Sequence, residues 1–416
     1  MSGVDSMLNK QENNDSGIED KHTPKLWTRS FITLTLASFL VFLNLQLLLS
    51  SFSIYIKGNL DGNDMYVSIS TSVFSATAII ARLLTPKWMK RWTRDTTLTI
   101  GLLVAAVTTA LNALPDSIMP LIINRAVFGL GFGVASTIIP TLVAQIIPPS
   151  RMGEGIGYFG LSTSLAMSIG PAAGISLMKE AGFTSLSIIG AAVLICAIPL
   201  LYASGVYRMF SKQDKKRQTS IAKTRWDKVF VLPIYFPAIL NVLVAITYSG
   251  ILSFIGVYGE ELGLGQVGLF FMFNAASILI VRPLSGKLFD RYGPMLVLIP
   301  SAMFMISSMV VLSYTTSMTH LIVSALLYGT GFGAIQPTLQ AWMLRRSEKE
   351  EYGAVNGLFY NSTDVGVSIG AMLLGLIVTL TSYAEMYRYS AICMVLFIVC
   401  VFVYQAVAKK KQRQEI

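Results

Sequence analysis

The chain has 416 residues, of which 53% are hydrophobic and only 13% charged, and its formal net charge is +10. Soluble proteins carry about 25% charged residues, so this composition excludes an ordinary set of soluble domains. The apolar residues gather in runs close to the ~20 residues that cross the ~30 Å hydrocarbon layer of a membrane. We therefore predict an all-α polytopic membrane protein.

In chain order, a polar segment comes first. It has neither an apolar core nor a small-residue cleavage site, so it is not a signal peptide, and we interpret 1–28 as a disordered cytoplasmic tail. Twelve spans are predicted after it: 29–55, 65–85, 97–114, 118–146, 154–178, 184–206, 230–257, 265–285, 295–314, 318–344, 354–380 and 385–407. A basic linker at 209–228 separates a first bundle (29–208) from a second (229–407), and a basic tail follows at 408–416.

The two bundles are predicted to be copies of one unit. Residues 121–170 and 321–370 align at a shift of 200 without a gap, and 14 of these 50 positions are identical. A second block obeys the same shift: Arg82, Leu84, Lys87 and Arg91 fall on Arg282, Leu284, Lys287 and Arg291. Apolar bias alone would not align glycines, arginines and a Ser-Thr pair in one register. The sequence therefore predicts two pseudo-symmetric six-helix bundles.

Lysine and arginine set the predicted orientation. With both termini in the cytoplasm, 26 of the 32 basic residues fall in cytoplasmic tails and loops, 3 in outer loops and 3 within or at the edge of spans. This asymmetry explains the basic composition, so no nucleic-acid partner is expected. We predict a multi-pass protein of the cytoplasmic (inner) membrane.

No grouping of residues for catalysis is visible in the sequence. The two histidines, His22 and His320, are far apart, and there is no phosphate loop of the GxxxxGK[ST] type. The three cysteines lie in apolar runs without the spacing of a metal site. We expect neither an enzyme nor a metal or other cofactor, so any work that the protein does must come from an ion gradient, a substrate gradient or a partner.

Three motifs resemble those of the major facilitator superfamily. GKLFDRYGP (286–294), between spans eight and nine, looks like the family's GxxxDRxGR loop motif. NRAVFGLGFG (124–133) in span four is similar to the RxxxGxGxG motif of proton-coupled members, and SIGPAAG (168–174) looks like the GPxxG motif of the drug-efflux branch. With the twelve spans, the resemblance implies a secondary transporter that works by alternating access and exports small organic molecules by proton antiport.

The resemblance implies that the loop at 286–294 acts as a gate. Gly286 and Gly293 permit a tight turn, and Asp290 can lie over the positive N-terminal end of a neighbouring helix. Arg291 can pair with an acid in the next inner loop, either Glu348 or Glu350. The alternative interpretation is a plain turn that carries positive-inside charge.

The matching segment of the first half departs from this pattern. Lys90 stands where the acid is expected, and Pro86 and Thr93 replace the glycines. Asp95, displaced by five residues, is the one acid nearby that can substitute.

Two ionisable residues are predicted to lie inside the membrane: Arg125 in span four and Asp364 near the middle of span eleven. Such groups are costly there and usually mark function. Asp364 shares a helical face with Tyr360 and Ser368. It either carries a coupled proton or is a structural carboxylate bonded to another helix, such as the Ser-Thr-rich span two. Arg125 either handles protons or substrate, or makes helix-bridging hydrogen bonds.

Small and polar residues in other spans complete the candidate site. Gly170, Pro171 and Gly174 allow close approach and kinking of span five, which suits rocking helices or static packing. In the family, spans 1, 4, 7 and 10 line the central cavity, and the alternative for a polar or aromatic residue there is packing. The candidates are Asn44, Gln46, Asn241, Tyr248, Tyr328, Gln336 and Gln340. Some exporters of the drug-efflux branch carry an acid in span one, and its absence here argues against proton coupling and against a strong preference for cationic drugs.

The expected substrate is a drug-like compound or an endogenous metabolite such as a siderophore. The other expected partners are protons and the lipid bilayer, and the expected state is a monomer. Two alternatives stay open: a proton-coupled importer of a small metabolite and a transporter-like sensor. A sensor would carry a long regulatory domain, and neither the tail nor the linker is long enough for one.

Overall fold

A computed structural model describes residues 25–62, 64–114, 117–203, 205 and 232–414. The predicted tail up to residue 24 and the linker at 209–228 lie outside these residues. The described elements are α2 (Arg29–Asn59), α3 (Asp64–Arg91), α4 (Arg94–Leu111), α5 (Ile118–Ile146), a 3-10 turn η1 (Pro149–Arg151), α6 (Met152–Ala203), α9 (Leu232–Glu261), α10 (Leu269–Tyr292), α11 (Met295–Ser313), α12 (Met318–Arg345), α13 (Tyr352–Leu380) and α14 (Tyr383–Gln414). This confirms the predicted all-α fold.

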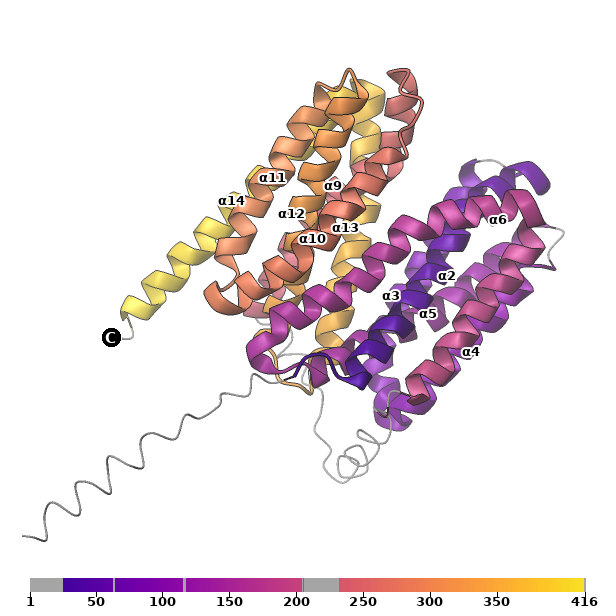
Figure 1. The fold of residues 1–416 in the computed structure, drawn as a ribbon, viewed down its shortest axis with the longest axis horizontal. Helices are drawn as coiled ribbons and strands as arrows, with labels where there is room; N and C mark the ends of the chain where they lie inside the picture. Colours follow the sequence, from indigo (N-terminus) through magenta and orange to yellow (C-terminus); the bar gives the residue numbers. More distant parts are fainter. Residues whose placement is uncertain (1–24, 63, 115–116, 204, 206–231, 415–416) are drawn as a thin grey trace, which may run out of the picture.

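Within the described residues, 11 helices are long and apolar enough to span a membrane, against the twelve predicted spans. The difference lies in α6, which runs for 52 residues through spans five and six. Gly182 interrupts it with φ 78° and ψ 168°, a backbone conformation that favours glycine. The chain folds back there, so α6 forms two arms (Figure 1), and the two predicted spans correspond to these arms.

The helices pack as two bundles, one from α2 to α6 and one from α9 to α14. Figure 1 shows the bundles near each other at the end where α6 and α13 begin and where α3 and α10 end. We call this the closed end. At the opposite, open end, where α4 and α11 finish, the bundles lie further apart (Figure 1). The C-terminal helix α14 ends on the side of the closed end.

Glycines bring the helices of each bundle together. A Cβ added at Gly131 of α5 would lie 2.5 Å from the carbonyl oxygen of Gly101 in α4. One added at Gly133 would lie 2.6 Å from the carbonyl oxygen of Ala78 in α3. The second bundle repeats this contact, because Gly331 of α12 meets the backbone of α11 in the same way. In lipid, such small residues allow close helix packing, so the repeated GFG motif is explained by packing alone.

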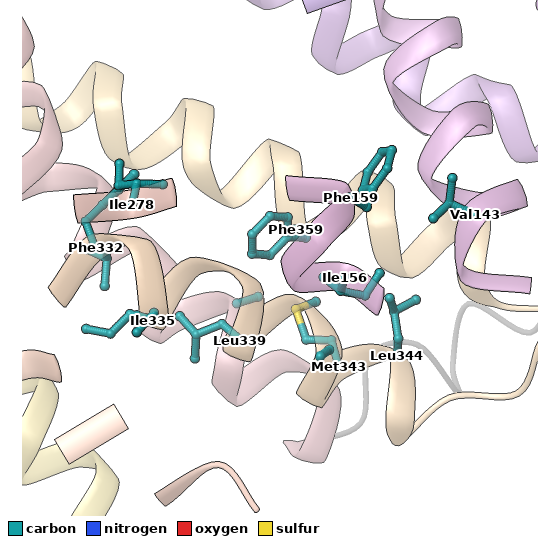
Figure 2. Close-up of a cluster of buried hydrophobic side chains, with 14 of the residues drawn as sticks. Val143, Ile156, Phe159, Ile278, Phe332, Ile335, Leu339, Met343, Leu344 and Phe359 are labelled. Carbon is teal, nitrogen blue, oxygen red and sulfur yellow. The ribbon is translucent and has the colours of Figure 1, made fainter. Parts of the chain in front are cut away.

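An apolar seal joins the two bundles at the closed end. Ile156 and Phe159 of α6 belong to the same buried cluster as Met343 and Leu344 of α12 and Phe359 of α13. Figure 2 shows these side chains gathered where the first bundle meets the second. We call this contact region between the two bundles the seam. Away from the seam, large apolar side chains such as Ile280 and Met372 are exposed, as expected of helices that face lipid.

Candidate functional site

The loop motif at the end of α10 reaches across to the start of α6. The two carboxylate oxygens of Asp290 accept hydrogen bonds from the backbone amides of Gly153, at 2.8 Å, and Glu154, at 2.9 Å. These amides have no partner inside α6, and the N-terminal end of a helix attracts negative charge. Asp290 therefore has the position that the sequence suggested, over a helix N-terminus, and here that helix belongs to the other bundle.

The glycines of this motif have different structural reasons. An added Cβ at Gly286 would overlap the carbonyl group of Gly153, so the residue permits backbone-to-backbone contact between α10 and α6. Gly293 ends α10 with φ 82°, which favours glycine.

The expected pairing of Arg291 with Glu348 or Glu350 is not among the ion pairs between described residues. Arg291 instead lies over the ring of Tyr292, with 5.1 Å between its Cζ atom and the ring centroid. The basic residues of the closed end meet Glu154, whose carboxylate lies 2.7 Å from Arg151 and 3.8 Å from Lys287. Two acids, Asp290 and Glu154, thus connect the end of α10 to the start of α6 at this side of the seam.

The pseudo-symmetric side, between α3 and α13, lacks this acid. Gly353 and Gly357 take the places of Gly153 and Gly157, and a Cβ at Gly357 would lie 3.6 Å from the carbonyl oxygen of Arg82. That is ordinary van der Waals separation, so α13 lies less tightly on α3. Gln145 of α5 donates a hydrogen bond of 3.1 Å to the carbonyl oxygen of Lys349. A polar side chain thus bridges the bundles near the position where the acid is missing.

An ion pair crosses the middle of the seam. Nη1 of Arg82 in α3 bonds to Oδ2 of Asp364 in α13, and the two side chains are 4% and 31% exposed. Arg82 also donates to Asn361 Oδ1 and to Ser136 Oγ, each at 3.2 Å. One interpretation of the sequence bonded Asp364 to span two, and the structure shows a bond to that helix, although to Arg82 and not to its serines or threonines. The signal was available, because Arg82 is a basic residue of span two in the repeated block.

Arg125 lies elsewhere, inside the first bundle, and its side chain is 1% exposed. Its Cζ atom lies 4.4 Å from the ring centroid of Phe52, 4.8 Å from that of Phe74 and 5.7 Å from that of Phe128. Its Nε atom has no hydrogen-bond partner among the described residues. The helices α2, α3 and α5 are therefore bridged here by cation–π contacts rather than by hydrogen bonds that Nε donates.

Asn241 of α9 is the centre of a polar cluster in the second bundle. Its amide nitrogen donates to Ser362 Oγ at 2.9 Å and to Thr363 Oγ1 at 2.7 Å. Its amide oxygen accepts from Gln336 at 3.0 Å. The repeated Ser-Thr pair thus ties α13 to α9, and Gln336 ties in α12.

The remaining cavity candidates mostly make contacts within one bundle. Asn44 donates to the carbonyl oxygen of Gly190 at 2.9 Å, and Gln340 donates to Asn356 at 2.8 Å. The rings of Tyr248 and Tyr328 stack on Phe332, with centroids 4.9 Å and 5.6 Å apart. These contacts suit the packing interpretation.

The glycines of the antiporter-type motif face α2. An added Cβ at Gly170 would lie 2.5 Å from Gln46 Cβ, and one at Gly174 would overlap the backbone of Leu47. Pro171 lies between them inside α6. The motif therefore makes a close contact between α2 and the first arm of α6.

Two bundles of membrane-length helices, related by an internal repeat and joined over a charged seam, define a membrane transporter built from structural repeats. Comparison with known proteins gives the family. Residues 34–371 match the model of the Major Facilitator Superfamily. The chain belongs to this superfamily, whose members are transporters of small molecules and not enzymes.

Two relatives show what the chain resembles in sequence. An uncharacterized MFS-type transporter of Methanocaldococcus jannaschii is 24% identical over 297 residues, which cover 70% of this chain and 76% of that protein. The multidrug resistance protein MdtG of Escherichia coli O9:H4 is 23% identical over 367 residues, which cover 85% of this chain and 89% of MdtG.

Solved structures share the fold. The human organic anion transporter MFSD10 matches with a TM-score of 0.73 and 15% identity, over 89% of this chain and 98% of that one. The proton:xylose symporter XylE matches with a TM-score of 0.73 and 13% identity, over 91% and 95% of the two chains. At these identities the likeness shows the fold alone.

Proposed function

We propose that this transporter exports small organic molecules, either drug-like compounds or an endogenous metabolite such as a siderophore, in exchange for protons. The resemblance of its span-five motif to antiporters and its 23% identity to MdtG, which is named a multidrug resistance protein, support export. The protein works as a monomer in this proposal. The bundles at 29–208 and 229–407 rock against each other, and the linker at 209–228 joins them.

The proposed orientation places both termini and the closed end in the cytoplasm. Basic residues flank this end on several helices: Lys87, Arg94, Arg151, Lys287 and Arg345. Short loops rich in lysine and arginine stay on the cytoplasmic side of a membrane. The structure then corresponds to an outward-facing conformation in the inner membrane, closed toward the cytoplasm.

Asp364 is the single observation that carries proton coupling. It is a carboxylate deep in a span, it is 31% exposed, and its partner Arg82 belongs to the other bundle. Protonation from the outside neutralises Asp364 and removes the ionic attraction across the seam. The closed end then opens, the proton leaves to the cytoplasm, and the renewed ion pair favours return to the outward-facing state.

Everted vesicles with an imposed pH gradient test the direction and the coupling together. We expect substrates from a broad panel of toxic compounds and metabolites to release protons from vesicles of the wild type, but not from those of Asp364→Asn. Glu385→Gln is the matched control, because Glu385 pairs with Arg388 one turn along the same helix, α14. Accumulation of the same compounds by right-side-out vesicles would show an importer and contradict export.

Growth protection gives the same test in cells. An overexpressing strain is compared with strains that carry Asp364→Asn or Arg125→Ala at equal protein level. Protection by the wild type that both variants lose supports export through these charges. Protection retained by Asp364→Asn makes that residue structural and removes the basis for proton coupling.

A further inference from the structure

The two halves carry the same buried arginine in different surroundings. Arg82 of α3 and Arg282 of α10 are 200 residues apart in the repeat and are 4% and 5% exposed. The guanidinium of Arg82 bonds to Asp364, Asn361 and Ser136. A guanidinium has five N–H donors and no acceptor, so these three oxygen atoms satisfy a large part of what it needs.

Arg282 has none of these partners. At the positions of Asp364, Asn361 and Ser136, the repeat places Ser164, Leu161 and Gln336. The amide nitrogen of Gln336 donates a hydrogen bond to Asn241, and among the described residues no hydrogen bond joins the amide oxygen of Gln336 to Arg282. Among the described residues, no hydrogen bond or ion pair involves the side chain of Arg282, and its Nε atom is buried without a partner. A buried cation in this state is costly unless an anion or acceptor joins it.

The guanidinium of Arg282 lies at the seam between the bundles. It contacts Gly160 of α6 so closely that an added Cβ there would overlap Nη1. Elsewhere on the seam, the Cζ atom of Arg82 lies 5.8 Å from the ring centroid of Tyr360 in α13. The two arginines thus serve the same seam, one with a fixed internal anion and one without. An anionic group that enters between the moving bundles can therefore accept hydrogen bonds from Arg282, whose donors have no partner among the described residues.

The charges of the spans point the same way. Four charged residues lie at least seven residues from the nearest helix end among the described helices, if the break at Gly182 is counted as an end. They are Arg82, Arg125, Arg282 and Asp364. Three positive charges and one negative charge leave a net +2. A membrane interior with this balance attracts an anion and repels a cation.

We propose that Arg282 binds the anionic group of the transported molecule, so that the substrate class is organic anions such as carboxylates. This deepens the proposed function and rests on it for the transport step. The site is the part of the seam where Arg282 of α10 contacts Gly160 of α6. Ser164, at the position of the repeat that corresponds to Asp364, has no carboxylate. The anionic group of the transported molecule therefore binds Arg282 as the carboxylate of Asp364 binds Arg82.

Binding is measured on the purified full-length protein in lipid nanodiscs, without a gradient, by thermal unfolding and by titration. The probes are benzoate, 2-naphthoate and citrate. Benzamide and 2-naphthamide are the neutral counterparts, and benzylamine and 2-naphthylmethylamine are the cationic ones. We expect at least one anion to stabilise the wild type while its neutral and cationic counterparts do not. Arg282→Gln should weaken that binding about 10-fold to 100-fold.

Lys179→Gln is the matched control for lost charge, because Lys179 lies on α6, the helix that Arg282 contacts, and is exposed. It should bind the anion as the wild type does. Arg282→Lys should retain part of the affinity, since it keeps the charge but loses the fork of donors.

Ser164→Asp tests the same idea without removing the arginine. Position 164 corresponds to Asp364 in the repeat and lies one helical turn after Gly160, on the same face of α6. The new carboxylate should pair with Arg282, raise the melting temperature by roughly 2–4 °C and abolish anion binding. Ser164→Asn, of the same size without charge, should do neither.

Three results would overturn the proposal. They are stabilisation by cationic probes only, anion binding that Arg282→Gln leaves unchanged, and no response to any probe at a concentration of about 10 mM, which is near the weakest affinity that is useful to measure. Failure of export in vesicles would leave this binding result intact. Failure of binding would leave proton-driven export of uncharged compounds intact. The two proposals are therefore judged separately.

Discussion

The guanidinium of Arg82 and the carboxylate of Asp364 form an ion pair that joins the first bundle to the second. Arg82 is almost fully buried, whereas Asp364 keeps 31% of its side-chain surface exposed. The pair therefore combines a buried cation with an acid whose side chain is partly exposed. The strength of this ion pair depends on the charge of Asp364. The attraction between the two bundles therefore depends on that charge as well.

Asp364→Asn should loosen the closed end. The substitution keeps a hydrogen-bond acceptor for Arg82 but removes the charge, at a cost of about 1–3 kcal/mol to the closed arrangement. Spin labels at Trp92 and Tyr292, two exposed residues at the closed end, should move apart when measured by electron–electron resonance in a protein whose native cysteines are serines.

The open end supplies the complementary distance. Labels at Leu114 and Tyr314, which are 70% and 63% exposed, should approach each other in Asp364→Asn if the bundles rock as rigid bodies. Asp364→Glu keeps the charge and should retain the wild-type distances. Unchanged distances in Asp364→Asn at both ends would mean that the ion pair does not hold the conformation.

Lys90→Asp should strengthen the closed end. In the second half Asp290 accepts hydrogen bonds from two amides at the start of α6. The equivalent start of α13 has Glu351 at its N-cap, without a side-chain cap. An aspartate at position 90 corresponds to Asp290 and should bond to the amides of Gly353 and Ala354. Such a cap contributes about 1 kcal/mol, which raises the melting temperature by roughly 2–4 °C.

Lys90→Ala separates the new cap from the loss of lysine. If Lys90→Asp is no more stable than Lys90→Ala, the start of α13 is not capped in this way. Asp290→Ala should show the reverse effect, a loss of about 1 kcal/mol and a more open closed end.

Gly157→Ala and Gly357→Ala should differ although the two positions are equivalent in the repeat. A Cβ at Gly157 would lie 2.7 Å from the carbonyl oxygen of Arg282, whereas one at Gly357 would lie 3.6 Å from that of Arg82. The first change forces α6 away from α10 and should cost about 1–3 kcal/mol. The second fits and should gain up to about 1 kcal/mol from helix propensity. Thermal unfolding measures both, and equal effects would contradict the asymmetric seam.

The fold was predictable because each span leaves a local signal. Apolar runs predict the helices, and the constant shift of 200 residues between matching segments predicts the two halves. The predicted spans five and six nevertheless lie in one element, α6, because the chain turns at Gly182 without a polar loop. The break depends on one backbone conformation, which composition does not reveal. The position of Asp290 was also predictable, because its loop motif resembles a known family motif and an acid is favoured over a helix N-terminus.

The partners across the seam were not predictable in the same way. The sequence identifies Asp364 and Arg82 separately, but their pairing depends on how α13 crosses α3. Asn241 and Gln340 were predicted as cavity candidates because they are polar residues in lining spans. The structure gives them partners on neighbouring helices, and a polar side chain in a span satisfies its hydrogen bonds wherever packing allows. Polarity alone does not distinguish these two situations.

Arg125→Met distinguishes a packing role of Arg125 from a role in transport. The guanidinium is buried among Phe52, Phe74 and Phe128. Methionine fills similar space and contacts aromatic rings favourably. Loss of cation–π contacts, about 0.5–2 kcal/mol, is offset because a buried charge without a partner at Nε no longer has to be desolvated. The free energy of unfolding should therefore change by only about 1 kcal/mol.

Transport should respond differently from stability. With the charge gone from this site, we expect Arg125→Met to lose substrate-driven proton release in everted vesicles, although the protein remains folded. Arg125→Lys keeps the charge but packs poorly against aromatic faces, so it should keep partial activity and lose more stability than Arg125→Met. If Arg125→Met transports as the wild type does, the arginine only bridges α2, α3 and α5. Proton coupling would then rest on Asp364, the one acidic residue deep in the described spans.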